Sequence, residues 1–383
     1  RIGARAEVRV GEVDADCLGL DEYLSGARRG LRLLDVAEDF GSAGLGDFDG
    51  VHAHHLAPIS EVTSIGKVGR AMKLARPDVF HPRIVLAGCP ALPEGDGDDA
   101  GLVAALRKRG LHARWLSWDD PATLKADLVI LRATWDYIDR LDEFLDWTRR
   151  VPRLLNPASV VAWNTDKRYL ADLAAAGVPT VPSAFFAPGE RVRLPDGEVV
   201  VKPAVGAGSV GALRFSDKSK AVAHATALQA RGQTVLVQPY DSRVGDGETA
   251  LVFLVGEQSH AFTKGPILPP PGEAPVFDES GTYAEERLQP AEPDFELWDV
   301  GRAALAAAAA TLGIGVEELL YARVDVLGGA DAPRLLELEL VEPSLGWRQL
   351  DDGERQRRQR GFALGVESAL EEFGLGPFSH RRP

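Results

Sequence analysis

The chain has 383 residues, of which 43 are lysine or arginine and 57 are aspartate or glutamate, so its formal net charge is −14. A chain of this length has room for two or three domains with a sizeable core. The acidic balance excludes broad binding to nucleic acid or to an anionic membrane, because both need a basic face.

The cellular setting follows from two further features. No run of about 18 apolar residues occurs, so we expect no membrane span. The chain has 2 cysteines, Cys17 and Cys89, which are too few for a disulfide framework and too far apart for a metal motif. We therefore expect a cytoplasmic protein in a reducing compartment.

The first part of the chain, 1–71, shows no clean alternation of strands and helices, although a helix is expected over 20–38. The one methionine, Met72, precedes the first convincing strand, at 83–88. We therefore expect the functional protein to begin near Met72, with 1–71 as an N-terminal extension outside the native fold.

From Arg83 onward, short apolar runs alternate with amphipathic segments. The pattern predicts strands at 83–88, 112–118, 127–134 and 154–156, with helices over about 102–110 and 141–151. The third strand is apolar on both faces and should be central. These elements predict a small open α/β domain over 72–160.

The pattern then shifts toward strands. A helix at 164–176 should be followed by strands at 178–186, 199–205, 212–215 and 235–240, with a helix at 218–231 between the last two. We place these segments in a part spanning 161–234 and a C-terminal part spanning 235–383. The C-terminal part should contain a hairpin, 248–255 and 259–264, an irregular proline-rich stretch, 266–293, a helix at 294–312, strands at 320–327 and 335–341, and a helix at 352–373.

A glycine-rich segment contains Gly206, Gly208 and Gly211 in the pattern G-x-G-x-x-G. In dinucleotide-binding folds this pattern opens a helix, and an acidic residue follows about 20 positions later. Here the next residues, 212–216, look like a strand, and no acid stands at that distance. The segment therefore predicts a strand–loop–strand hairpin that closes over phosphates, with a dinucleotide loop and a plain structural hairpin as alternatives.

Lys202 lies in the apolar run 199–203, just before this loop. A lysine inside an apolar strand is costly unless it meets an anion, so Lys202 predicts a phosphate contact. No Walker A pattern occurs, which excludes a P-loop protein.

Several segments, in a fixed order, resemble the ATP-grasp superfamily of carboxylate–amine ligases. They are 164–168, 201–203 with the glycine loop, 235–240, 245–248, 321–325 and 335–339. In addition, 132–137 is similar to the group that contains cycloserine synthetase, the O-ureidoserine cyclo-ligase, and glutathione-synthetase-like proteins. The resemblance covers about 83–375 and implies an ATP-grasp fold of the α/β class, preceded by a small open α/β domain.

The resemblance also implies the residues that hold ATP. These are Lys167, Lys202, Gly206, Gly208, Ser209, Val210, Gln238, Pro239, Tyr240, Glu248 and Lys264. The strand with Gln238 would read adenine and Glu248 would hold the ribose. Lys264 is expected at an exposed strand end, where it either contacts phosphate or is simply solvated.

A metal site is expected on the last two strands. In a strand, Glu337 and Glu339 point to the same face, and two carboxylates on one face repel unless a cation lies between them. With Asp325 they predict an oxygen cage for Mg²⁺; the resemblance implies two ions, with Mn²⁺ as a substitute. An exposed acidic edge strand is the alternative, and Glu342 is an alternative to one of the pair.

The resemblance implies the reaction. A carboxylate attacks the γ-phosphate to give an acyl phosphate and ADP, and an amine then displaces phosphate to leave an amide. Arg323 and Lys202 are the expected catalytic residues, since they would neutralise the transferring phosphate. Arg132, Asp136 and Arg348 are candidates for the acceptor, although packing of the turn by Trp135 explains the first two equally well.

Two other functions stay open, a nucleotide-binding protein without catalytic activity and a dinucleotide-dependent oxidoreductase. The expected partners are a small carboxylate and an amine, with a homodimer as a further possibility. The sequence does not identify either substrate, because acceptor loops vary independently of the nucleotide site.

Overall fold

The computed structural model describes residues 81–273, 275–276 and 287–376, all of which belong to the unit Met72–Pro383. The expectations for 1–71, including the helix at 20–38 and the start near Met72, lie outside the described residues.

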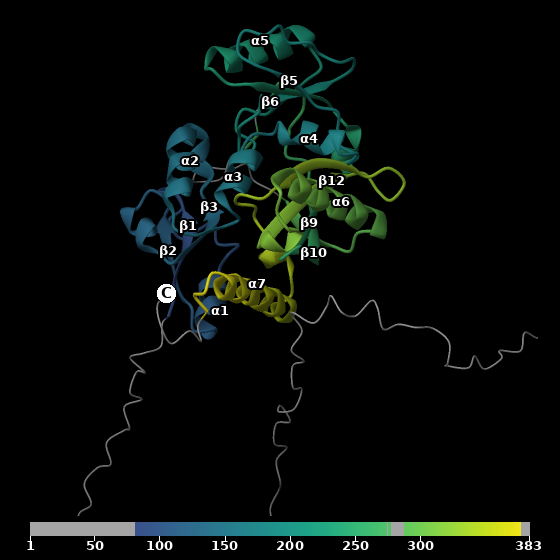
Figure 1. Ribbon diagram of the computed structural model, residues 1–383. Helices are drawn as coiled ribbons and strands as arrows, with labels where there is room; N and C mark the ends of the chain where they lie inside the picture. The colour runs from purple at the N-terminus through teal and green to yellow at the C-terminus, as the bar shows by residue number, and fades with distance from the viewer. Residues whose placement is uncertain (1–80, 274, 277–286, 377–383) are drawn as a thin grey trace, which may run out of the picture. The chain divides into compact units, whose positions relative to one another are not determined.

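A parallel four-stranded sheet, in the order β2-β1-β3-β4, begins the described chain (Figure 1). Its elements are β1 (Arg83–Gly88), α1 (Leu102–Lys108), β2 (His112–Ser117), β3 (Leu128–Ala133), α2 (Leu141–Arg150) and β4 (Leu154–Leu155). β3 is buried along its whole length, as its apolar residues on both faces predict. The small open α/β domain is therefore confirmed.

A second, antiparallel sheet has the order β5-β8-β6-β7. It contains β5 (Ala184–Phe186), β6 (Val199–Pro203), β7 (Leu213–Phe215) and β8 (Val235–Pro239), and helix α5 (Lys218–Ala230) packs against it. The glycine loop joins β6 to antiparallel β7, so the predicted strand–loop–strand hairpin is confirmed. β8 pairs within this sheet, whereas the sequence places 235 onward in the C-terminal part.

The third sheet has five strands in the order β11-β10-β9-β12-β13. Its elements are β9 (Glu248–Leu254), β10 (Glu257–Lys264), β11 (Leu288–Ala291), α6 (Phe295–Leu312), β12 (Tyr321–Leu327) and β13 (Arg334–Glu339), followed by α7 (Asp352–Glu372). The alanine-rich α6 packs closely on the sheet, since a Cβ at Gly301 would lie 2.8 Å from the Phe253 ring. β11 is an unpredicted strand within the proline-rich stretch.

The helix expected at 164–176 is wrong. Two helices take its place, α3 (Ala158–Asn164) and α4 (Tyr169–Ala175). The chain leaves the helix between them because the Lys167 amide donates to the Ala204 carbonyl at 2.8 Å and Asp166 forms a β-bridge with Val205. The strand expected at 178–186 is likewise shorter, because the Val181 amide bonds to Leu335 instead of continuing β5.

Two buried asparagines connect the parallel sheet to the C-terminal sheet. The Asn156 amide nitrogen donates to the carbonyls of Tyr321 (3.0 Å) and Leu340 (2.7 Å), and its oxygen accepts from the Leu320 amide (2.8 Å). Asn164, the last residue of α3, donates to the Leu338 carbonyl and accepts from the Leu340 amide, at the end of β13 and just after it. One apolar core cluster also spans both sheets, so these parts share their packing.

Candidate active site

A cavity of about 540 Å³ brings together most of the residues that the sequence assigns to ATP. The predicted residues that line it are Lys167, Lys202, Gly206, Gly208, Ser209, Val210, Gln238, Pro239, Tyr240, Glu248, Lys264, Arg323, Glu337, Glu339 and Arg348. Most of them come from the glycine loop, from strands β6 and β8 of the middle sheet and from strands β9, β10, β12 and β13 of the third sheet.

The glycine loop and two lysines form one wall of the cavity. Gly208 and Gly211 have φ values of 57° and 75°, a conformation that glycine adopts without strain. Ser209, between them, has a φ of 63°. The Lys167 ammonium donates to the Gly206 carbonyl at 2.7 Å and pairs with Glu337 at 2.8 Å. Within the described residues, Lys202 forms no ion pair. Burial, together with the nearby Lys167, lowers the pKa of Lys202.

The end of β8, with Gln238 and Pro239, and the following residue Tyr240 line the cavity. The Gln238 side chain is buried and donates to the Ser183 hydroxyl at 2.9 Å. The Arg214 guanidinium lies over the Tyr240 ring, 3.6 Å from its centroid, which fixes the ring by a cation–π contact.

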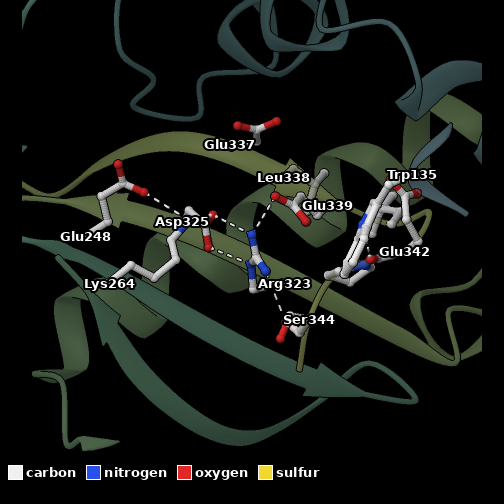
Figure 2. A network of polar contacts seen from close by, with 12 residues as sticks. Trp135, Glu248, Lys264, Arg323, Asp325, Glu337, Leu338, Glu339, Glu342 and Ser344 are labelled. Carbon is white, nitrogen blue, oxygen red and sulfur yellow. Dashed lines mark hydrogen bonds and ion pairs between the residues drawn. The ribbon is translucent and has the colours of Figure 1, made fainter. Parts of the chain in front are cut away.

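Lys264 is buried, so the exposed strand end expected from the sequence is wrong. Its ammonium lies 2.6 Å from Asp325 and 3.0 Å from Glu248 (Figure 2). The two carboxylates compensate for its burial. The sequence does not reveal that Lys264 is buried, because its nearer partner, Asp325, is 61 residues away along the chain.

Arg323 connects the acidic residues of β12 and β13. Its Nε lies 3.0 Å from Asp325 Oδ1, and its Nη2 lies 2.5 Å from Glu339 Oε1 (Figure 2). Nη1 donates to the Ser344 carbonyl at 3.1 Å. The guanidinium is thus held rigidly at the cavity wall.

The three carboxylates assigned to metal have protein cations as partners. Asp325 and Glu337 stand directly opposite each other in the β12–β13 register, a repulsive arrangement for like charges. Asp325 lies behind the cavity wall rather than lining it. Among the described residues, no three acidic, histidine or cysteine side chains are gathered as a ready metal-ligand set.

Three glutamates of the cavity wall, Glu337, Glu339 and Glu342, have pKa values far from the usual one. Burial alone would raise the pKa of Glu337, but Lys167 and Lys202 lower it to about 2. Burial raises the pKa of Glu339 to about 7 despite the neighbouring Arg323, and the charges of Asp325 and Glu337 add to the rise. Burial raises the pKa of Glu342 to about 8, with Glu339 adding to the shift.

Two acceptor candidates do not line the cavity. Arg132 is buried, and its Nε lies 2.8 Å from Asp99 while Nη2 donates to the Pro343 carbonyl at 2.7 Å. Asp136 accepts from the Trp118 indole at 2.7 Å. Arg132 is buried and Asp136 is held at the turn outside the cavity lining, so the expectation that they face the acceptor is wrong and packing around the turn explains them. Arg348 does line the cavity, and its guanidinium donates to the carbonyls of Gly97 and Asp96.

A further group of residues lines the cavity, and the sequence assigned none of them to ATP or to the acceptor; Glu342 was named only as an alternative metal ligand. We call it the Trp135 group: Asp96, Asp98, Trp135, Tyr137, Glu342 and Ser344. Figure 2 places Trp135 and Glu342 on the opposite side of Arg323 from Glu248 and Lys264. Asp98 joins two distant segments, since it accepts from the Ser344 hydroxyl and the Arg348 amide. The only sequence signal was the position of Asp98 and Trp135 after strands of the parallel sheet, where ligands commonly bind.

Known proteins resemble this chain over most of its described length. A family model described as the N-terminal domain of D-cycloserine synthetase DcsG matches residues 84–156. The cycloserine biosynthesis protein DcsG of Streptomyces lavendulae is 38% identical over 279 residues, which is 67% of this chain and 90% of that protein.

The chain belongs to the ATP-grasp superfamily, in the DcsG family. The crystal structure of D-cycloserine synthetase DcsG matches with a TM-score of 0.65 at 34% identity, over 75% of this chain and 99% of that one. A D-alanine–D-alanine ligase from Bacillus anthracis, complexed with ATP, matches with a TM-score of 0.51 at 14% identity, over 76% of this chain and 98% of that one, and so shares the fold.

This ATP-grasp protein is an ATP-dependent ligase that joins a carboxylate to an amine. Its relatives favour that function over a catalytically inactive nucleotide-binding protein. The hairpin between β6 and β7 removes the basis for a dinucleotide-dependent oxidoreductase. None of the helices in the described part of the chain has the length and apolar character needed to span a bilayer.

Proposed function

We propose that the cavity binds ATP and activates the carboxylate of a small amino acid, which a side-chain nitrogen of the same molecule then attacks to close a ring, as in cycloserine synthesis. The observation that carries the nucleotide part is Lys202, whose ammonium lines the cavity beside the glycine loop without an ion pair among the described residues. An unpaired cation next to loop amides suits an anion, and a triphosphate is the anion that this superfamily uses.

The lining residues divide the nucleotide between them. Lys167, Lys202 and the loop amides would hold the phosphates, with Lys264 able to turn from Glu248 toward them. The Gln238–Tyr240 strand end would take the adenine and Glu248 the ribose. Arg323 would neutralise charge on the transferring phosphate, as its fixed position at the wall allows.

The carboxylates fit Mg²⁺ by their chemistry. Asp325, Glu337 and Glu339 offer only oxygen donors, and the raised pKa of Glu339 marks charge that is not fully neutralised. We assign these three residues to two ions, with Mn²⁺ as a substitute and phosphate oxygens and waters as the remaining ligands. When bound, the metal neutralises the phosphates. The chain's own residues orient the carboxylate and exclude water from the acyl phosphate.

The substrate class follows from the DcsG relationship and has a direct test. We propose to measure ADP release from the protein with Mg²⁺–ATP and a panel of amino acids and small carboxylates that includes O-ureidoserine. We expect ADP release with O-ureidoserine, together with formation of cycloserine once water removes the carbamoyl group from the ring nitrogen. ADP release with none of the panel, despite tight ATP binding, would contradict a ligase function and favour a nucleotide-binding role.

A charge-neutral change tests the metal assignment. Glu337→Gln keeps the size of the side chain but removes the charge opposite Asp325, so metal affinity should fall by roughly 10- to 150-fold, the equivalent of a lost charged contact. The measurement is ADP release as a function of Mg²⁺, where excess Mg²⁺ should partly restore the rate. An unchanged Mg²⁺ dependence would place the metal elsewhere, and Glu342 would be tested next.

We also propose a cytoplasmic enzyme, because its reaction consumes ATP and it has few cysteines. A homodimer is the expected assembly. Analytical ultracentrifugation across a range of protein concentrations measures it, and a single monomer mass at all concentrations would contradict it.

A further inference from the structure

One acidic side chain in the cavity lacks the partners that the others have. Glu342 lies just after β13, lines the cavity and is 6% exposed. Its backbone carbonyl accepts from the Trp135 indole at 3.2 Å, which fixes the residue beside that ring (Figure 2). Its Oε2 is buried and has no hydrogen-bond partner in the described part of the chain.

The groups that face Glu342 come from four elements and leave this oxygen unneutralised. Tyr137 donates toward the carboxyl group, while Glu339 repels it. The nearest cations are engaged elsewhere, since Lys167 pairs with Glu337 at 2.8 Å and Arg132 pairs with Asp99 at 2.8 Å. Glu342 therefore has a hydroxyl donor on one side and an unused acceptor on the other.

A buried acceptor without a hydrogen bond destabilises the folded protein. Leaving a buried polar group without a hydrogen bond costs about 1–3 kcal/mol, and this cost is tolerated mainly where a ligand supplies the missing donor. The cavity wall with Lys202 suits the anions of the reaction. The Glu342 carboxylate lies on the other side of Arg323 from Lys264. Because its oxygen is a hydrogen-bond acceptor, it suits a nitrogen that carries hydrogen.

We propose that Glu342 binds the attacking amine of the substrate and takes its proton as the amide forms. This inference rests on the proposed ligase function and extends it to the second half of the reaction. Glu342 would be a catalytic residue in contact with the nitrogen, and Tyr137 a positioning residue that holds its carboxyl group.

The step balances without a further reactant. The nitrogen lone pair attacks the carbonyl carbon of the acyl phosphate, and the new C–N bond forms as the C–O bond to phosphate breaks. Phosphate leaves with that bonding pair, and Oε2 of Glu342 accepts the proton that the nitrogen loses. Because burial raises the pKa of Glu342 to about 8, its carboxylate is a stronger base than an ordinary glutamate, and the ionised form that accepts the proton predominates above that pH.

Hydroxylamine separates the two halves of the reaction. It is small, largely uncharged at neutral pH and strongly nucleophilic, so it captures an acyl phosphate as a hydroxamate without help from a base. We expect Glu342→Gln to lose roughly 10²- to 10⁴-fold in amide formation with the substrate found by ADP release. Hydroxamate formation at high hydroxylamine concentration should stay close to the wild-type rate.

Glu339→Gln is the matched control, because it changes a neighbouring carboxylate that is assigned to metal, and it should lose both reactions. Glu342→Asp keeps the charge but withdraws the oxygen, so it should show the same selective loss in weaker form. Thermal melting of each variant checks that the fold is intact, and the aspartate variant carries the test if the glutamine variant unfolds.

The outcomes are distinct. Selective loss of amide formation supports the inference. Wild-type amide formation in both Glu342 variants overturns it, as does equal loss of both reactions, and loss that excess Mg²⁺ restores would make Glu342 a metal ligand. If the wild-type protein releases no ADP with any of the carboxylates and amino acids tested, the proposed function and this inference are overturned together, whereas the other results leave the proposed function standing.

Discussion

The lysine group, Lys167, Lys202 and Lys264, and the Trp135 group lie on the same cavity but obtain their geometry differently. Each lysine sits in or beside a strand of an antiparallel sheet, next to a loop or a carboxylate on a neighbouring strand. The Trp135 group is assembled from the loop after β1, the turn after β3 and the segment after β13. Only Lys202 and the glycine loop are adjacent in the sequence, whereas the pairs of Lys167 and Lys264 join distant strands and the Trp135 group depends on how three separate segments meet.

The two regions also differ in the role of their charged side chains. In the lysine group, Lys202 has no ion pair among the described residues and is available to an anion. Behind the Trp135 group, Arg132 and Asp99 are nearly inaccessible to solvent and neutralise each other. We therefore expect a cation to serve ligand binding in one region and folding in the other, so that substitutions can separate the two roles.

The largest expected effect is on stability. Arg132→Ala leaves Asp99 buried without its partner, which should lower the free energy of unfolding by about 3–5 kcal/mol. Urea unfolding measures it. Arg149→Ala is the control, because its pair with Asp146 lies on the surface of α2, and it should change stability by less than about 1 kcal/mol. Similar values for the two variants would mean that the buried pair is not structural.

The next effect is on affinity. Lys202→Ala removes a charge-assisted contact of about 1.5–3 kcal/mol, so ATP should bind roughly 10- to 150-fold more weakly in calorimetry while the fold remains stable. Lys220→Ala, on the exposed surface of α5, should bind ATP like the wild type. Unchanged ATP affinity in a folded Lys202→Ala variant would move the phosphates away from this wall.

The smallest effect concerns pH and the segment that carries Glu342. Burial lowers the pKa of His260 to about 4, and its Nε2 lies 2.6 Å from the Leu345 carbonyl. Because the unfolded chain binds this proton near pH 6.5, the contribution of His260 to stability is present above that pH and is lost as the pH falls toward 4.

Between pH 7 and pH 5, the wild type should therefore lose about 2 kcal/mol more unfolding free energy than His260→Gln, which cannot titrate. Urea unfolding of both proteins at the two pH values measures the difference. Parallel losses in the two proteins would show that His260 is protonated equally in the folded and unfolded states.

Sequence reasoning predicted the fold and singled out Lys202 because their signals are local. Lys202 stands four residues before Gly206, and the alternation of Glu337 and Glu339 is visible within one strand. The break between α3 and α4 was not visible, because it is imposed by the Ala204 carbonyl, which lies far along the chain from Lys167. Glu342 was noted only as an alternative to a metal ligand, since its setting depends on Trp135 and Tyr137, about 200 residues earlier.

The buried Asn156 side chain also constrains the order in which the protein can mature on the ribosome. Its amide donates to the Leu340 carbonyl, 184 residues later, and its oxygen accepts from Leu320. During synthesis the parallel sheet therefore leaves the exit tunnel well before the backbone that satisfies this asparagine exists. We expect nascent chains that end before 340 to remain protease-sensitive throughout the parallel sheet, so that this sheet completes its folding together with the C-terminal sheet.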